Sequence, residues 1–195
     1  QKTSSGLSIP ELIVKNGSIP GIKVDKGAKV LSGSPEETIT EGLDGLRDRL
    51  KEYYKLGARF TKWRAVIKIT NNYPTVQCIK SNSHALARYA AMVQECDMVP
   101  IVEPEVLMDG NHDIDKCYNV TQNVLNDCYE QLALHKVELK GTVLKPNMVI
   151  HGIDCQKKSA TDEIAKKTLD CLKKNVPEDV TGIAFLSGGQ SEIES

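Results

Sequence analysis

Charged residues recur in this chain at a nearly constant spacing, inside segments that otherwise have the character of buried strands. Short apolar or β-branched runs alternate with longer helix-like stretches, which favours βα units and a parallel sheet. The polar residues near the carboxyl ends of successive runs are Lys23, Lys62, Glu103, Lys145 and Ser187. A step of about 40 residues is typical of a (β/α)8 barrel with long loops.

The same spacing predicts that the barrel is incomplete. Eight steps of this size need roughly 320 residues, whereas the chain has 195. We therefore expect an α/β fold with about five of the eight βα units of a TIM (β/α)8 barrel, forming one partial catalytic domain over residues 1–195. Because the chain opens at Gln1 and closes on the acidic run SEIES, we expect it to be truncated at both ends. An open doubly wound sheet can be built from five strands, but it gives no reason for charges in nearly every strand.

The expected strands cover residues 20–24, 58–69, 98–106, 141–149 and 182–186. The first expected helix runs to Gly57 and has three possible starts. Residues 34–37, with the sequence SPEE, match a capping box with proline at the first helical position. Glycines at positions 42 and 45 interrupt that helix, so Thr38 or Thr40 is an alternative cap.

Three further helices are expected. One lies around residues 85–95, and the last is capped by residues 159–162 and turns Ile164, Leu169 and Leu172 inward. The longest carries a buried stripe with a period of 3.6 residues, made of Ile114, Cys117, Val120, Val124, Leu125, Cys128 and Leu132.

Four of the expected strands carry polar residues two positions apart, and such residues share one face of a strand. The pairs are Lys23 and Asp25, Lys62 and Arg64, Glu103 and Glu105, and Lys145 and Asn147. Strands flanked by helices have no solvated face, so four such pairs are hard to explain as packing alone. We expect them to point into the mouth of the barrel at its carboxyl end, where sites of this fold lie.

The chemistry of these residues suits a phosphorylated carbonyl compound. The cations, together with Ser187, Gly188 and Gly189, can bind phosphate, because glycines let backbone N–H groups approach an anion. Crowded lysines disfavour each other's charge, and a neutral Lys145 in the apolar run VLKPN is a nucleophile toward a carbonyl. Glu103 can shuttle protons. The residues therefore predict a Schiff-base enzyme, and they leave an aldolase, a dehydratase and a transaldolase open.

Composition excludes several other classes. A net charge of −1 argues against nucleic acid and anionic membranes as partners, and no apolar run approaches the length of a membrane span. The six cysteines form no CxxC and the four histidines are scattered, so no local motif predicts a metal. We expect the cysteines to be reduced, with Cys117 and Cys128 in the core.

The motifs together resemble class I fructose-bisphosphate aldolase. They are GIKVDKG (21–27), TEGLDGL (40–46), KWRAVIKI (62–69), VPIVEPEVLMDG (99–110), LKPNMV (144–149) and FLSGGQSE (185–192). The resemblance runs in one order from about residue 19 onward, and it implies that the five strands are the third to the seventh of the barrel. It also implies a lyase of glycolysis and gluconeogenesis that needs no metal or other cofactor, because the substrate is held as a covalent lysine Schiff base.

The resemblance further implies a role for each site residue. Lys145 forms the imine, Glu103 is the general acid and base, and Lys62 orients that carboxylate. Glu105 pairs with neighbouring lysines, and Lys23 and Arg64 bind the substrate and its distal phosphate. Ser187 and Gly188, with Gly189 beside them, bind the phosphate nearer the ketone. The expected partners are a phosphorylated sugar and, in the intact protein, three further copies in a cytoplasmic homotetramer.

A function other than catalysis stays open for this chain. The family's first strand supplies a catalytic aspartate and its eighth an arginine, and neither segment is in this chain. A five-strand arc also leaves two open edges, each a site for aggregation or pairing. The alternative is an inactive fragment that binds a phosphosugar or a partner protein without turnover.

Overall fold

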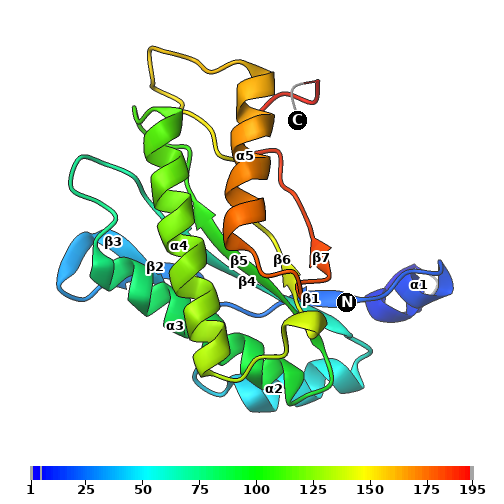
Figure 1. Cartoon of the computed structure of the whole chain (residues 1–195). Helices are drawn as coiled ribbons and strands as arrows, with labels where there is room; N and C mark the ends of the chain where they lie inside the picture. The colour runs from blue at the N-terminus through cyan, green and yellow to red at the C-terminus, as the bar shows by residue number, and fades with distance from the viewer. Residues whose placement is uncertain (1, 5, 194–195) are drawn as a thin grey trace.

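The computed structural model describes residues 2–4 and 6–193, and its main feature is one parallel sheet of five strands. The order across the sheet is β1-β4-β5-β6-β7, so each strand lies beside its neighbour in the chain order of βα units (Figure 1). The strands are β1 (Gly21–Lys23), β4 (Phe60–Ile67), β5 (Val99–Val106), β6 (Val143–Leu144) and β7 (Gly182–Ile183). The predicted incomplete (β/α)8 barrel is confirmed.

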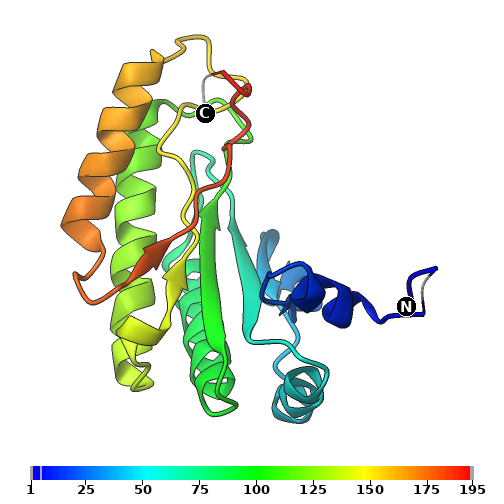
Figure 2. The same cartoon turned by 90° about the vertical axis from the view of Figure 1, so that its right-hand side faces the viewer.

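Three long helices cover one face of this sheet: α3 (Val76–Gln94), α4 (Ile114–Leu134) and α5 (Thr161–Asn175). Helix α3 packs on β4 and β5, α4 packs on β5 and α3, and α5 packs on α4. Figure 2 shows the same layer from the side. A doubly wound sheet has helices on both faces, so this one-sided layer favours an arc of a barrel.

Two shorter α-helices precede the three long ones. Helix α2 (Leu46–Lys55) buries Leu46 and Leu50 and packs on α3, whereas α1 (Ile9–Lys15) buries none of its residues and stands apart from the other helices (Figure 1). Within residues 2–4 and 6–193, β1 and β7 each pair on one side only, as expected for an arc with two open edges.

Strand β4 shows how the sheet separates its core from its site. Its residues alternate between buried and partly exposed along its whole length, as a strand with two different faces requires. Trp63 is buried on the helix side and stacks on Tyr89 of α3, with the ring centroids 5.4 Å apart. The neighbours Lys62 and Arg64 therefore point to the opposite face, which is the inside of the arc.

The predicted stripe of the longest helix is confirmed. All seven of its apolar positions are buried in α4, including Cys117 and Cys128, which are free thiols. Burial raises the pKa of both thiols, to about 12 for Cys128. They are therefore protonated core residues, as the sequence predicts.

All five strands are shorter than expected, and two of them markedly so. The predicted strand at 141–149 contains only Val143 and Leu144 as β6, and its first residue, Gly141, ends a 3-10 helix, η1 (Leu139–Gly141). Pro146 has no N–H group to continue the ladder, so pairing ends near Lys145. The predicted strand at 182–186 likewise shortens to β7. Lys145 and Asn147, and Asp25 after β1, thus lie just beyond strands rather than inside them.

The helix expected from the capping-box pattern at 34–37 is wrong. Those residues begin β3 (Ser34–Thr40), which pairs antiparallel with β2 (Ala28–Leu31) as a hairpin. Helix α2 starts later, and its N-cap is Gly45 rather than Thr38 or Thr40. The hydroxyl of Thr40 instead donates to the carbonyl of Arg64 at 2.7 Å and holds the hairpin on β4.

In the structure, the Glu37 carboxylate of that pattern accepts hydrogen bonds from a residue far along the chain. Ser34 Oγ donates to Glu37 Oε2 at 2.7 Å, and Glu37 also accepts hydrogen bonds from the backbone N–H and the hydroxyl of Thr75. Thr75 is the N-cap of α3, which begins nine residues before the expected helix at 85–95. The Glu37 carboxylate therefore stabilises the N-terminus of a different helix, α3.

Helix α5 differs from its prediction in two ways. It begins where residues 159–162 predict, with Ala160 as its N-cap, but no side chain caps it. Ile164 and Leu172 are buried as predicted, but Leu169 is 53% exposed. Leu169 lies outside the buried stripe of this helix, whose members recur three or four positions apart: Ile164, Thr168, Cys171 and Leu172.

Glu37 provides a stability prediction that depends on pH. Burial acts to raise the pKa of this carboxyl, but hydrogen bonds from Thr75, Ser34 and Cys78 outweigh it and lower the pKa. A lowered pKa means that the stabilisation is present above the ordinary carboxyl value and is lost as pH falls through the native value. We expect Glu37→Gln to cost about 1–3 kcal/mol at pH 7, and to make the unfolding free energy less sensitive to acid below pH 4.5.

This prediction can be measured by urea unfolding followed through Trp63, the single tryptophan of the chain. The control is Glu36→Gln, an exposed neighbour on the same strand. Equal slopes of stability against pH in Glu37→Gln and the unsubstituted protein would contradict the assignment.

Candidate active site

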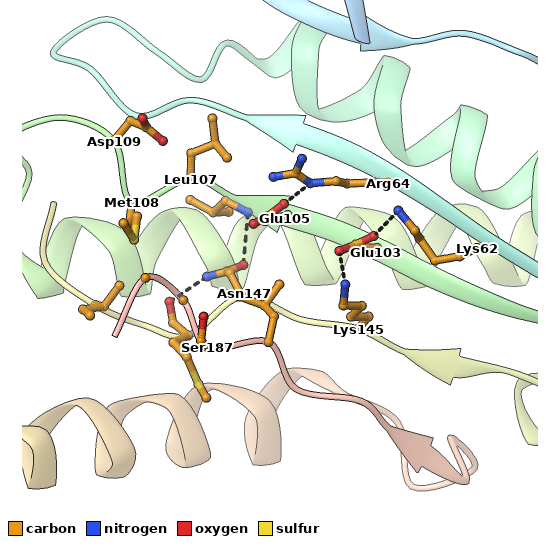
Figure 3. Close-up of a pocket in the computed structure, with 16 residues that line it drawn as sticks. Lys62, Arg64, Glu103, Glu105, Leu107, Met108, Asp109, Lys145, Asn147 and Ser187 are labelled. Atoms are coloured by element: carbon orange, nitrogen blue, oxygen red, sulfur yellow. Dashed lines mark hydrogen bonds and ion pairs between the residues drawn. The ribbon is translucent and has the colours of Figure 1, made fainter. Parts of the chain in front are cut away.

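A cavity of about 460 Å³ opens on the inner side of the arc, where β4, β5, β6 and β7 end. Most of its polar lining comes from the strand positions that the sequence singles out (Figure 3). The lining residues are Lys62, Arg64, Glu103, Glu105, Val106, Leu107, Met108, Asp109, Lys145, Asn147, Met148, Ile150, Leu186, Ser187, Gly188 and Gly189. Eight of the nine predicted site residues are therefore in one cavity, and Lys23 is the exception.

The centre of the cavity is one buried carboxylate between two lysines. Glu103 Oε1 lies 2.7 Å from Lys145 Nζ, and Glu103 Oε2 lies 2.9 Å from Lys62 Nζ (Figure 3). The Glu103 side chain is 2% exposed, whereas those of Lys145 and Lys62 are 29% and 23% exposed. Each ammonium group therefore has a polar partner inside the site and remains accessible to a molecule in the cavity.

Sheet register brings Lys145 and Glu103 together. Val143 pairs with Ile101 in the parallel ladder, and Lys145 N donates to the carbonyl of Val102 at 2.8 Å. Lys145 therefore lies beside Glu103 even though regular pairing has ended. Residues opposite one another on adjacent parallel strands project to the same face, so Lys145 and Glu103 meet inside the arc.

A second ion pair lies one step farther along the same strands. Arg64 Nε contacts Glu105 Oε2, and that side chain is 13% exposed. The hydrogen bond to Glu105 raises the pKa of the Arg64 guanidinium. Burial opposes this shift, and the charges of Glu105, Glu103 and Asp25 reinforce it. The prediction that Glu105 pairs with lysines is wrong, because its ion pair is with this arginine. The guanidinium is a permanent cation that lines the cavity.

The Ser187-Gly188-Gly189 segment closes one side of the cavity. Both glycines have positive φ angles, 61° and 76°, which favour glycine. A Cβ atom on Gly188 would lie 3.0 Å from Met148 Cβ, and one on Gly189 would lie 2.1 Å from the thioether of Met108. The absence of side chains therefore lets this backbone lie against Met148 and Met108 at the edge of the cavity, where its N–H groups and the Ser187 hydroxyl can approach an anion.

Lys23 and Asp25 are arranged differently from the other pairs. Lys23 Nζ lies 2.6 Å from Asp25 Oδ1 and also donates to the carbonyl oxygen of Asp25, outside the lining of the cavity. The Asp25 side chain is 3% exposed, and Asp25 Oδ2 accepts a long hydrogen bond of 3.4 Å from the backbone N–H of Arg64. This pair is thus linked to the site through β4, and Lys23 stands at its border with 55% of its side chain exposed.

Sequence reasoning missed several lining residues on the segment after β5. Leu107, Met108 and Asp109 follow directly on the strand that carries Glu103 and Glu105. Their position after a strand with two inward carboxylates is the signal that points to them, because the loops at the carboxyl ends of strands form the site of this fold.

The described residues contain no group of three or more histidine, cysteine or acidic side chains arranged to hold a metal ion. In the same part of the chain, no helix combines the length and the apolar character needed to cross a membrane.

The geometry combines three chemical functions. Lys145 can supply a nucleophilic nitrogen, and the carboxylate of Glu103 at 2.7 Å can take up or return its proton. Arg64 and the Ser187-Gly188-Gly189 segment can bind anionic groups on two sides of that pair. A substrate with a carbonyl group between two phosphates matches this layout.

Comparison with known proteins gives a family match over the whole chain. The profile of a family described as "Glycolytic: Fructose-bisphosphate aldolase class-I" matches residues 1–195. A relative from Xylella fastidiosa, named probable fructose-bisphosphate aldolase class 1, is 55% identical over 195 residues. Those residues are 100% of this chain and 58% of the relative. An Arabidopsis thaliana relative, named fructose-bisphosphate aldolase 4, cytosolic, is 54% identical over 100% of this chain and 50% of its own length.

A solved structure gives the same result for the fold. It is described as a ternary co-crystal structure of fructose-bisphosphate aldolase from Plasmodium falciparum in complex with TRAP and a small molecule inhibitor. It is 46% identical and has a TM-score of 0.96 over 100% of this chain and 56% of the other. The chain thus spans a little over half the length of the proteins that it matches.

Proposed function

Because the chain belongs to the class I fructose-bisphosphate aldolase family, we propose that the longer protein containing it reversibly cleaves fructose 1,6-bisphosphate. The products are dihydroxyacetone phosphate and glyceraldehyde 3-phosphate, in glycolysis and gluconeogenesis. The proposal assigns the chemistry to a covalent lysine Schiff base, with no metal and no other cofactor. The observation that carries it is the pair of contacts from Glu103 to Lys145 and Lys62, at 2.7 and 2.9 Å.

In this proposal the reaction starts at Lys145. Its neutral nitrogen attacks the ketone carbon of the substrate, which gives a carbinolamine after proton transfer to the former carbonyl oxygen. Glu103 then donates a proton to the hydroxyl group, which leaves as water, and the nitrogen forms the protonated imine. The contact of Glu103 with Lys145 supports this role, since a proton can pass directly between groups at that distance.

Carbon–carbon cleavage follows from the imine. The positively charged nitrogen withdraws the electron pair of the bond between C3 and C4, while a base takes the proton of the C4 hydroxyl. Glyceraldehyde 3-phosphate leaves, and the enamine that remains is protonated at C3 and hydrolysed to dihydroxyacetone phosphate. Lys62, held at Glu103, stabilises the charge that develops on that carboxylate and keeps it oriented.

The phosphates are assigned to the two sides of the cavity. Ser187, Gly188 and Gly189 bind the phosphate nearer the ketone, and Arg64 with Lys23 binds the distal one. Support comes from the positive φ angles of the two glycines and from the permanent charge of the guanidinium. Glu105 holds that guanidinium in place through its ion pair.

Borohydride trapping tests the proposal directly. The longer protein is incubated with dihydroxyacetone phosphate and sodium borohydride, which reduces an imine to a stable secondary amine, and the adduct is located by peptide mass mapping. We expect one adduct per chain, on Lys145. The 195-residue chain is treated in parallel to test whether the cavity forms without the rest of the protein.

Each outcome decides between the two functions. An adduct on Lys145 in both samples supports the aldolase proposal for the chain itself. An adduct in the longer protein alone means that this piece is an inactive part of the enzyme. No adduct in either sample rules out the Schiff-base mechanism and leaves a role in binding a phosphosugar or a partner protein.

The proposal also covers organisation. Residues 1–195 form part of one (β/α)8 catalytic domain whose other units come from flanking segments of the longer protein, which is a cytoplasmic homotetramer. The word "cytosolic" in the names of Arabidopsis relatives supports the location. Light scattering of the purified longer protein would test the assembly, since a mass other than four chains contradicts it.

A further inference from the structure

We propose that Asn147 is a positioning residue that replaces the missing end of β6 and thereby holds Lys145 against Glu103. The inference rests on the proposed function, because it concerns the lysine assigned to imine formation. Asn147 lines the same cavity and is 3% exposed. The amide cannot act as an acid or a base at neutral pH, so any contribution must come from its contacts.

The sequence creates a gap in the sheet directly after Lys145. Strand β5 runs on to Val106, whereas β6 ends at Leu144, and the last backbone bond between the two segments runs from Lys145 N to Val102 O. Pro104, the β5 residue whose nitrogen lies opposite the Lys145 carbonyl in this register, has no N–H group to donate to it. The next N–H group of β5 that faces β6 is that of Val106, and a buried N–H left unpaired would be costly.

The side chain of Asn147 fills that gap. Its Oδ1 accepts the hydrogen bond from Val106 N at 3.1 Å, in place of a backbone carbonyl. Its Nδ2 donates to Thr121 Oγ1 of α4 at 3.0 Å and to Met148 O at 3.0 Å. One buried amide thus connects the end of β5, the helix layer and the loop after β6, as Figure 3 shows for its contacts on the cavity side.

These contacts fix the chain on the carboxyl side of Lys145. On its amino side, the backbone bond to Val102 already holds the residue. With Asn147 fixed two positions later, the backbone at Lys145 is held at both ends, which limits the motion of its side chain relative to Glu103. Reacting groups must be held within a fraction of an ångström for efficient chemistry.

A substitution at Thr121 can weaken the contacts of Asn147 without changing a residue that lines the cavity. It is 1% exposed in the core of α4 and is not among the lining residues. Thr121→Val keeps the shape and removes the acceptor for Asn147 Nδ2, and Thr121→Ser keeps the hydroxyl but removes a methyl group. Thr142→Val is the matched control, because Thr142 is equally buried and donates one hydrogen bond, to Leu139 O at 2.7 Å, before β6.

The experiment measures the rate of imine trapping in the longer protein over a range of dihydroxyacetone phosphate concentrations, together with the thermal stability of each variant. We expect Thr121→Val to lower the maximal trapping rate by about tenfold and to change the half-saturating concentration by less than about twofold. Thr121→Ser and Thr142→Val should retain the normal rate even where they lower stability.

The pattern separates positioning from general destabilisation. The inference is overturned if Thr121→Val reacts at the normal rate, or if Thr121→Ser and Thr142→Val lose rate along with it. If the unsubstituted protein forms no adduct, the proposed function fails and this inference fails with it. If that protein reacts and the variants show no difference, only the role of Asn147 is lost.

Discussion

Replacing Lys145 with arginine should abolish the borohydride-stable adduct with dihydroxyacetone phosphate. Arginine keeps a positive charge and a long side chain, but its guanidinium does not deprotonate in proteins and cannot attack a carbonyl. We expect cleavage of fructose 1,6-bisphosphate to fall by at least about four orders of magnitude, the scale on which loss of a catalytic nucleophile acts. The measurements are the steady-state cleavage rate and the mass of the trapped protein.

Lys140→Arg is the control for this substitution. Lys140 lies in η1, five positions earlier in the same segment, and its exposed side chain forms a long ion pair of 3.7 Å with Asp179. It should leave both measurements unchanged. A trapped adduct that persists in Lys145→Arg, for example on Lys62, would mean that the nucleophile is a different lysine.

Replacing Glu103 with glutamine should slow the reaction by about 10² to 10⁴-fold, the range for loss of general acid and base catalysis. The amide keeps the size of the side chain and can still contact Lys62 and Lys145, but it cannot exchange protons with them. The loss should be seen in kcat for cleavage and in the rate of imine formation. Substrate binding should change less, because the groups assigned to the phosphates are untouched.

Glu105→Gln is the informative comparison, since it removes a carboxylate two positions along the same strand. Its partner is Arg64, which is assigned to phosphate binding, so its main effect should be on KM rather than on kcat. If the two variants lose kcat equally, the proton transfer is not specific to Glu103. If Glu103→Gln keeps normal kcat, another group is the acid and base.

Local patterns predicted the elements whose stability depends on nearby residues. The stripe of α4 is a property of one helix packing on one layer, and all seven of its positions are buried as expected. The polar residues that recur about every 40 positions predicted the order of βα units, because each unit of such a barrel contributes one strand to the site. Eight of the nine predicted site residues line the cavity for this reason.

The errors have different physical origins, and one of them is competition from a distant partner. The SPEE run has the local chemistry of a helix start, yet its Glu37 is satisfied by Thr75, which lies 38 positions away. Leu169 lies outside the stripe of α5 that is buried, whose members recur three or four positions apart: Ile164, Thr168, Cys171 and Leu172. The composition of residues 141–149 predicts a long strand, but β6 ends at Leu144 because Pro146 cannot donate a hydrogen bond to the ladder.

The sequence alone therefore determined the fold class, the family resemblance and the set of residues available for chemistry. These follow from residue type and spacing, which local physics and the barrel repeat control. Only the tertiary structure decided which charges pair: Glu103 with Lys62 and Lys145, and Glu105 with Arg64. Such pairing depends on the register between strands about 40 residues apart and on where each ladder stops, and neither is encoded in the periodicity of a single segment.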